Sequence, residues 1–393
     1  MKRICVIGNF SGRNAGDAAI LGGLLEDVSR LYPDAEFDVP TINPGFVARQ
    51  YAGYRVRPVP MLPWNLSVKI LGLPIFRSVL RSDLVLVTDA ILFDLHLFNP
   101  LFNYLSTMAL VLPLARRRGI PVVLYNVSLG PVSTKAGIGC LRRVLDASSK
   151  VIVRDTESIE MLKRVGLERA DLRIAADCAL NTVPSDDARV AQIIRERDLV
   201  FDEQGVVTFN VNSYVDVFVR GQKKGIGLDE FVPLMAEAFD RTIESLNIRP
   251  LMVVTQPMDF TITNAVMSRM RQREKIRTVA NPEYSYRDLT ALFAKAEMHI
   301  GMRTHSLILA TSVGTPVVGI IATPKNRGYM KSIRQDERMV EFKDLTADYL
   351  AEMIRKTWAN RKAIREELLP IVAEEKRKAR ESAAELAPFL KGT

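Results

Sequence analysis

Short apolar runs alternate with amphipathic stretches along this chain, and that alternation constrains the fold more than any other feature. The first run, Arg3 to Gly8, is followed by a Gly- and Asn-rich loop and by a helical pattern from Asp17 to Tyr32. A strand, a loop and a helix in this order open a doubly wound parallel sheet. Parallel strands are buried on both faces, which explains why their runs are continuously apolar.

The strand runs form two series, and 393 residues are too many for one hydrophobic core. The further predicted strands are residues 83–87, 122–125, 151–153, 205–210, 251–255, 276–279, 298–301 and 317–321. We therefore expect an α/β protein with two Rossmann-like parallel-sheet domains, residues 1–190 and 200–345, followed by one or two C-terminal helices within 346–393. The charged segment Asp187 to Asp202 is the expected connection. Because ligands bind outside the carboxyl ends of such strands, we expect the two domains to face a cleft and the chemistry to lie in the loops that follow the strands.

Composition limits the class of partner and the compartment. The net charge of +9 fits an anionic substrate, nucleic acid or an anionic membrane surface. No zinc-finger, helix-turn-helix or RNP pattern supports nucleic acid, so we predict no nucleic-acid partner. The three cysteines, Cys5, Cys140 and Cys178, are widely spaced and predict reduced core residues in a cytoplasmic protein without a metal site. The apolar stretch Leu97 to Leu114 is interrupted by polar residues and prolines and reads as a buried core helix.

The segment around Arg303, Thr304 and His305 carries the strongest chemical signal. It reads as strand, sharp loop and helix, so these residues lie where unpaired backbone N–H groups and the helix dipole favour an anion. Arginine adds a planar fork for phosphate or carboxylate, and histidine can transfer a proton near neutral pH. The structural alternative is that Arg303 pairs with a nearby acid and His305 caps the helix. His299 is expected to be a hydrogen-bonded core residue, and His96 is a weaker candidate.

Three further segments follow predicted strands and carry polar or charged residues. In the first loop, Asn14 and Gly16 could shape a donor- or sugar-facing surface, and Asp17 has helix capping as its alternative role. It matches neither a Walker A loop nor a dinucleotide fingerprint. Arg154 is a second candidate cation, with a surface arrangement beside Asp155 plus helix capping as the alternative. Lys325 is a third, whereas for Arg327, in the same segment, a solvated loop is the preferred interpretation.

In the order of these motifs the chain resembles the polysaccharide pyruvyl transferase family. The family's Asn-x-Gly-Asp loop is matched by residues 14–17, and its Arg-Asp before a serine is matched by residues 154–158. Its Arg-x-His-Ser/Thr-Leu segment with a following Gly-x-Pro is matched by residues 303–307 and 314–316, and its later lysine by Lys325. The matches span roughly residues 8 to 330.

The resemblance implies a GT-B-like fold with acceptor binding in the N-terminal domain and a donor anion site in the C-terminal one. It implies transfer of an enolpyruvyl-derived group from phosphoenolpyruvate to two hydroxyls of a sugar, glycan or lipid-linked glycan, giving a ketal and phosphate without a cofactor. Carried over by residue, Arg303 and Arg154 would hold the donor, His305 would be the general acid or base and Lys325 would assist. The neighbouring Thr304 and Ser306 are further candidates for binding substrate.

One departure from the family keeps other functions open. Relatives often carry a Gly-Gly pair where this chain reads Asp89-Ala90, which raises a question about backbone approach to a ligand there. The alternatives are a nucleotide-sugar glycosyltransferase of GT-B architecture and a non-catalytic binding module. The segment Tyr54 to Ser82 mixes aromatic, aliphatic and basic residues. It reads either as a peripheral membrane patch at the inner face of a membrane or as a core helix with a basic edge.

Overall fold

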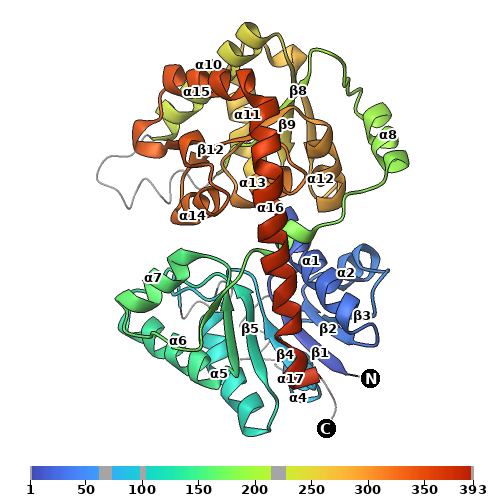
Figure 1. Cartoon of the computed structure of the whole chain (residues 1–393), viewed down its shortest axis with the longest axis vertical. Coiled ribbons are helices and arrows are strands. Elements are labelled where there is room, and N and C mark those ends of the chain that lie inside the picture. Colours follow the sequence, from blue (N-terminus) through green and yellow to red (C-terminus); the bar gives the residue numbers. More distant parts are fainter. Residues whose placement is uncertain (1, 62–72, 98–102, 214–226, 391–393) are drawn as a thin grey trace. The chain divides into compact units, whose positions relative to one another are not determined.

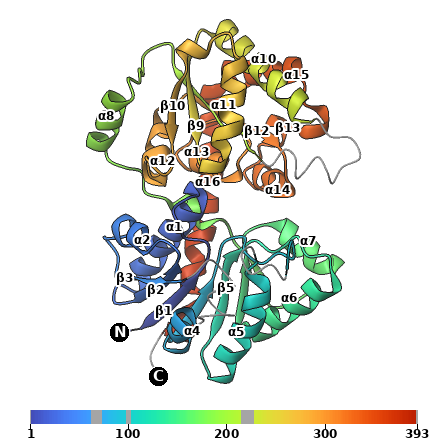
Figure 2. The same ribbon diagram turned by 180° about the vertical axis from the view of Figure 1, so that it is seen from behind.

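The computed structural model describes residues 2–61, 73–97, 103–213 and 227–390. They form two compact α/β units, each with its own parallel sheet (Figures 1 and 2). The first unit comprises Met1–Gly12, Ile20–Asn181 and Glu375–Thr393, and the second comprises Arg13–Ala19 and Thr182–Glu374. The two parallel sheets confirm the predicted fold class. The N-terminal segment Arg13–Ala19 belongs by its contacts to the second unit, which matters for the site below.

The first unit is built on a seven-stranded sheet with the order β3-β2-β1-β4-β5-β6-β7. Its strands are β1 (Arg3–Ile7), β2 (Glu36–Thr41), β3 (Val56–Pro60), β4 (Leu84–Val87), β5 (Val122–Val127), β6 (Lys150–Val153) and β7 (Arg173–Ile174). Its helical segments are α1 (Ala15–Leu31), α2 (Pro44–Gln50), α4 (Leu73–Leu80), α5 (Leu105–Arg117), α6 (Lys135–Ala147), α7 (Thr156–Arg164), η1 (Cys178–Asn181) and α17 (Ala387–Leu390). Apolar side chains of α4, α5, α6 and α7 form one core with the sheet.

The second unit is built on a six-stranded sheet with the order β10-β9-β8-β11-β12-β13. Its strands are β8 (Val206–Phe209), β9 (Arg249–Val254), β10 (Arg277–Ala280), β11 (Met298–Gly301), β12 (Val317–Ile321) and β13 (Met339–Glu341). Its helices are α8 (Asp187–Glu196), α10 (Leu228–Leu246), α11 (Phe260–Arg269), α12 (Tyr286–Lys295), α13 (Thr304–Ser312), α14 (Pro324–Ser332) and α15 (Ala347–Ala359), with short 3₁₀ turns η2 (Pro257–Asp259), η3 (Arg273–Lys275), η4 (Asp336–Arg338) and η5 (Phe342–Asp344).

Alternating strand residues of the second sheet face different helices. Met298 and Ile300 of β11 join the core made by α10, α11 and α15. His299, between them, lies on the other side, where its ring is 4.7 Å from the ring of Phe293 in α12. The helix α16 (Arg361–Ala384), a long continuous helix in Figure 1, has its first part in the second unit and its last part in the first.

Both sheets place their first strand in the middle, so the strand order reverses between β1 and β4 and again between β8 and β11. In doubly wound sheets, ligands bind at the carboxyl ends of the strands beside such a reversal. In the second unit these ends are followed by Asn210 and by the turn from Met302 to His305. The sheet topology and the sequence motif therefore both indicate the turn from Met302 to His305 as the place where a ligand binds.

Each predicted strand is present, but two expectations about helices were wrong. The described part of the tail forms three helices, α15, α16 and α17, instead of one or two. The charged segment Asp187 to Asp202, the expected connection, contains helix α8 and belongs to the second unit, which begins at Thr182. The core helix predicted within Leu97 to Leu114 is present from Leu105 onward and packs one face into the core, with Leu110 47% exposed on the other face. Of Tyr54 to Ser82, the described part holds strand β3 and helix α4, so it is not one core helix, and residues 62–72 lie outside the description.

Candidate active site

The turn after β11 presents Arg303 and His305 at the start of α13. Arg303 is the N-cap residue, in an extended conformation, and His305 is the second residue of the helix. The helix begins at Thr304, so His305 lies inside it and does not cap it. Arg303, Thr304 and His305 are half-buried, whereas Ser306 is fully buried. The turn thus offers two chemically active side chains at a helix N-terminus.

Arg303 forms a bidentate ion pair with Asp259. Its Nε and Nη2 donate to the two carboxylate oxygens of Asp259 at 2.8 and 2.7 Å. The Asp259 side chain is completely buried and the Arg303 side chain is 14% exposed. The structural alternative for Arg303, pairing with a nearby acid, is therefore present. This ion pair leaves the guanidinium of Arg303 partly exposed, and it fixes the orientation of the planar N–H donors.

A buried hydrogen-bonded chain lies under the turn. The two ring nitrogens of His299 lie 2.9 Å from Thr208 Oγ1 and 2.9 Å from Ser306 Oγ. Ser306 Oγ in turn donates to the carbonyl of Arg303 at 2.8 Å. Burial lowers the pKa of His299 to about 3, so this imidazole is neutral at physiological pH. His299 is the hydrogen-bonded core residue that the sequence predicted.

The segment Asn14 to Asp17 packs within the second unit. Ala15 N donates to the carbonyl of Thr255, which follows β9, at 2.9 Å. Asn14 Oδ1 accepts the N–H of Gly16 at 2.9 Å, and Asn14 Nδ2 donates to Asp17 Oδ1 at 2.8 Å. Helix α1 begins at Ala15, so Asp17 lies inside its first turn and is not the cap. Asn14 satisfies an N–H of that first turn instead.

Gly16 and His305 are in direct contact. A Cβ placed on Gly16 would lie 2.3 Å from both Cγ and Nδ1 of His305. Position 16 therefore needs glycine because the imidazole lies against its backbone, and not for a special φ angle. The structure brings the N-terminal motif and the Arg-x-His motif together although nearly 300 residues separate them in the chain.

The exchange Gly16→Ala is predicted to displace His305. We expect turnover to fall by about 10²-fold, because a shift of about 1 Å in a reacting group has an effect of that size. Activity assays and thermal unfolding of the variant test this. Gly139→Ala in α6 is the matched control, because nothing lies within 4 Å of a Cβ there. Equal activity in Gly16→Ala and wild type would show that the imidazole position is unimportant.

Lys325 and Arg327 lie in the first turns of α14. The helix begins with Pro324 and is capped by Thr323, so the loop predicted for Arg327 is wrong. Arg327 pairs with Glu341 through two hydrogen bonds of 2.7 and 2.6 Å. Asn326, between the two cations, donates to the carbonyl of Met302 at 2.7 Å and so ties α14 to the turn after β11. This bond brings the backbone of Lys325 near that turn.

Arg154 belongs to the first unit, whereas Arg303, His305 and Gly16 belong to the second. Its Nη1 is 2.8 Å from Asp177 Oδ2, and both side chains are more than nine-tenths buried. Burial alone would lower the pKa of Arg154, but the carboxylates of Asp177, Asp89 and Asp155 outweigh burial and raise it. The predicted surface arrangement of Arg154 and Asp155 is wrong, because Arg154 is buried against Asp177. The helix capping predicted with it is confirmed, because Asp155 caps α7 by accepting from Ser158 N at 2.8 Å.

The Asp89-Ala90 departure keeps a glycine-like backbone. Asp89 adopts φ of 70°, a left-handed conformation that glycine favours, and its carboxylate accepts the N–H of Ala90 at 2.6 Å. The later Asp94 binds the N–H groups of Ser133 and Thr134 at 2.8 and 2.7 Å. Asp89 can thus adopt the left-handed backbone conformation that glycine would favour at this position, because its side chain forms a local hydrogen bond.

The remaining sequence predictions concern His96, a metal site and a membrane span. His96 is an exposed residue of the first unit. Across the described ranges, no group of three or more His, Cys, Asp or Glu side chains is arranged for a metal ion. Among the described helices, none combines the length and apolarity that crossing a membrane requires.

Sequence reasoning missed Asp259, Asn210 and Thr255. Asn210 Oδ1 accepts the N–H of Arg303 at 3.1 Å, while its Nδ2 donates to the carbonyl of Val253 at 2.9 Å. All three residues directly follow strands or start the next helix of the second sheet. The available signal was their position after β8 and β9, the strands on one side of the order reversal.

The two parallel-sheet α/β units place this chain in the GT-B structural class. Residues 14–322 match the family model described as polysaccharide pyruvyl transferase. The match covers well over half of the chain, so this protein belongs to the polysaccharide pyruvyl transferase family and is a transferase. The predicted family is confirmed.

Relatives agree with this class. The amylovoran biosynthesis protein AmsJ of Erwinia amylovora is 22% identical, over 95% of this chain and 96% of that protein. Among solved structures, UDP-GlcNAc 2-epimerase of Neisseria meningitidis has a TM-score of 0.65 at 10% identity, covering 99% of each chain. HepE of Anabaena, solved with UDP-glucose, has a TM-score of 0.62 at 14% identity, covering 99% of this chain and 100% of that one. At these identities the structural likeness establishes the fold alone.

Proposed function

We propose that this chain transfers the enolpyruvyl-derived group of phosphoenolpyruvate to two hydroxyls of a sugar in a polysaccharide or glycan precursor. The product is a cyclic pyruvate ketal, and phosphate is released. Family membership supports the transferase class. The observation that carries the proposal is the contact between His305 and Gly16, which joins the starts of α13 and α1 beside Arg303.

The donor would be held by its negative charges. Arg303 supplies directed N–H donors, and the starts of α13 and α1 add favourable helix dipoles. Thr304 and Ser306 belong to the same turn, and Lys325 adds a cation on the neighbouring α14. Preorganised donors of this kind stabilise charge that develops on the leaving phosphate. Asn14 and Asp17 shape the Gly16 backbone that the imidazole contacts.

His305 would carry the proton transfers. As imidazolium it protonates the methylene carbon of the donor, which leaves the adjacent carbon electron-poor. A first sugar hydroxyl attacks that carbon and returns its proton to His305. The bond from this carbon to the phosphate oxygen then breaks with its electron pair leaving on phosphate, and the second hydroxyl closes the ketal and gives its proton to the released phosphate. No redox change or cofactor is needed.

Arg154 remains a proposed substrate contact of the first unit. Its guanidinium is buried against Asp177, so a ligand could reach only its outer edge. The acceptor is proposed to be a sugar or glycan, and in the narrower form a lipid-linked glycan with peripheral membrane contact near residues 54–82. Sedimentation with anionic vesicles tests that narrower form, and binding unaffected by anionic lipid speaks against it.

The donor assignment separates this function from its rivals. HepE was solved with UDP-glucose, so a nucleotide-sugar donor is the main alternative. We expect thermal stabilisation by phosphoenolpyruvate but not by a panel of nucleotides and nucleotide sugars, and phosphate release that persists in EDTA when candidate glycans are added. Stabilisation by UDP-sugars alone would replace the proposal with a glycosyltransferase. No phosphate release with any glycan and no donor binding would favour a non-catalytic module.

A further inference from the structure

Asp259 stands at a helix start but does not cap the helix. It ends the 3₁₀ turn η2 and precedes α11, and its side chain accepts no hydrogen bond from that helix. The carboxylate instead accepts hydrogen bonds from Nε and Nη2 of Arg303. Its Oδ1 also accepts a hydrogen bond from the N–H of Ser213 at 2.9 Å. Other aspartates at helix starts, such as Asp155 and Asp186, cap their own helices. The carboxylate of Asp259 is thus committed to Arg303 and the loop after β8.

Asn210 holds the backbone of the same arginine. It follows β8, is 1% exposed and uses both ends of its amide: Oδ1 accepts from Arg303 N and Nδ2 donates to the carbonyl of Val253 in β9. Its own N–H donates to the carbonyl of Ile300 in β11 at 2.9 Å. One buried amide therefore joins the carboxyl ends of three adjacent strands to the Arg303 turn.

The buried chain under the turn is tied to it through Ser306. Ser306 Oγ donates to the carbonyl of Arg303 at 2.8 Å and lies 2.9 Å from Nε2 of His299. The other ring nitrogen of His299 lies 2.9 Å from Thr208 Oγ1, which also donates to the carbonyl of Met298 at 3.3 Å. The neutral His299 thus anchors the turn without adding a charge beneath Arg303.

These contacts fix both the backbone and the guanidinium of Arg303 before any ligand binds. Burying an ion pair is weak support for stability, because desolvation offsets the attraction between the charges. Fixing a long, flexible side chain in one orientation does lower the entropic cost of binding a ligand through it. The pair with Asp259 also cancels most of the net charge of Arg303. Arg303 would therefore contribute directed N–H donors, and general attraction of an anion would come from Lys325 and the helix N-termini.

We propose that Asp259 and Asn210 are positioning residues that present Arg303 to the donor anion. The inference rests on the proposed function, since it takes phosphoenolpyruvate as the anion that Arg303 meets. Neither residue needs to touch the donor. Asp259 sets the plane and direction of the guanidinium, and Asn210 sets the turn from which the side chain projects.

The test measures the affinity of the full-length chain for phosphoenolpyruvate by titration calorimetry in Asp259→Asn. The exchange keeps the size of the side chain and removes the charge and one acceptor of the fork. We expect the Kd to rise by about tenfold, the upper range for losing the preorganisation of one long side chain. If this variant does not fold, Asp259→Glu replaces it, because it keeps the charge but moves the fork by one methylene. A raised Kd supports the proposal, and an unchanged Kd overturns it.

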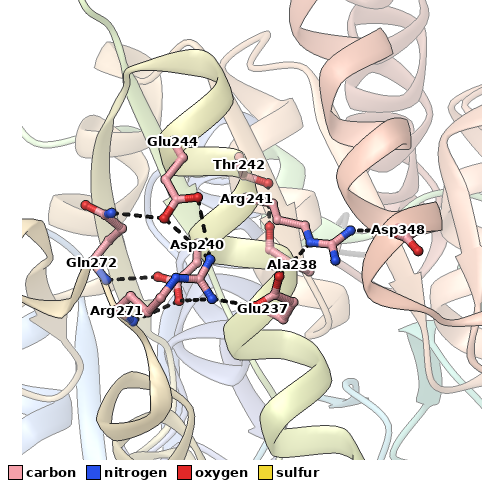
Figure 3. A network of polar contacts seen from close by, with 9 residues as sticks. All are labelled: Glu237, Ala238, Asp240, Arg241, Thr242, Glu244, Arg271, Gln272 and Asp348. Atoms are coloured by element: carbon pink, nitrogen blue, oxygen red, sulfur yellow. Dashed lines mark hydrogen bonds and ion pairs between the residues drawn. The ribbon is translucent and has the colours of Figure 1, made fainter.

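Asp240 provides the matched control in the same unit (Figure 3). It is 1% exposed, and its carboxylate accepts the backbone N–H groups of Arg271 and Gln272 at 2.8 and 2.9 Å, in a network of α10 that does not include Arg303. Asp240→Asn should lower Tm while leaving the Kd for phosphoenolpyruvate unchanged. If both variants lower Tm and neither changes the Kd, Asp259 is purely structural. If wild type and Arg303→Ala both fail to bind phosphoenolpyruvate, the proposed function fails and this inference falls with it.

Discussion

Replacing His305 with alanine should lower phosphate release from phosphoenolpyruvate, with an accepted sugar, by about 10²–10⁴-fold, the usual contribution of a positioned acid or base. The side chain is half-buried at the second position of α13 and lies against Gly16. Alanine is a good helix former, so α13 should persist and Tm should change little. His305→Gln, which keeps hydrogen-bonding groups but transfers no proton near neutral pH, should be nearly as inactive.

The chain supplies its own control for this measurement. It contains three histidines, and His96 is an exposed residue of the first unit. His96→Ala should keep wild-type turnover under the same assay. Turnover near wild type in His305→Ala would remove the imidazole from the mechanism. An equal loss in both variants would point to a general effect of the exchange on the enzyme.

The parts of the site that the sequence predicted are those formed by neighbours in the chain. Arg303 and His305 share one strand-to-helix turn, so a local pattern is sufficient to place them. Asp259 is different, because it follows β9 while Arg303 follows β11, and β8 lies between these strands. Apolar periodicity identifies strands but does not give their order in the sheet. The pattern therefore could not show that Asp259, which follows a strand two positions away in the sheet, pairs with Arg303.

The strands β2 and β3 were missed for a local reason. Asp38 and Pro40 interrupt the apolar run of β2, and Arg57 and Pro58 interrupt β3. In the structure the charges satisfy each other, since Arg57 Nε donates to Asp38 Oδ1 at 2.8 Å. β3 is the edge strand, where proline is tolerated. A cross-strand pair can thus place a charge in a strand that sequence alone would reject.

Helix α14 shows the opposite error. The sequence contained a helix start signal, but a loop was the preferred interpretation for Arg327. Thr323 caps the helix by accepting from Asn326 N, and Pro324 occupies its first position, where proline needs no N–H donor. The cations and Gly328 in the same segment suggested a loop. The segment forms a helix because, beside this start signal, Tyr329 and Met330 give it a buried face.

The largest stability effect is expected at Asp27 in α1. Its carboxylate is completely buried, accepts Asn181 Nδ2 at 2.7 Å, and lies 3.9 Å from Arg380 Nε in α16. Burial raises the pKa of Asp27 to about 7, and the bond from Asn181 and the charge of Arg380 only partly oppose this. The unfolded chain releases the proton near pH 4. Between about pH 4 and 7 the folded state therefore binds the proton more tightly, so stability falls as pH rises through this window and stays lower above it.

Asp27→Asn should remove this pH dependence. At pH 5 the variant should already be the more stable one by about 1.5 kcal/mol, because the unfolded wild type is ionised there although its folded side chain is still neutral. At pH 8 to 9 the difference should grow to about 4 kcal/mol, because each pH unit between about 4 and 7 contributes about 1.4 kcal/mol. Thermal unfolding from pH 5 to 9 measures the difference. Asp34→Asn, at a carboxylate that is 81% exposed, removes the same charge and should show no such trend.

The position of Asp27 explains why a carboxylate with this cost would be retained. Asn181, its hydrogen-bond partner, also donates to the carbonyl of Lys376 at 3.3 Å. Asn181 and Lys376 lie where the chain passes between the units, at Asn181–Thr182 and at Glu374–Glu375. Asp27 thus orients the amide that ties these two segments together. If Asp27→Asn gains stability above pH 7 yet exchanges amide hydrogens faster around Asn181 and Lys376, the carboxylate is kept for local order. Unchanged exchange there would contradict that role while leaving the pH prediction standing.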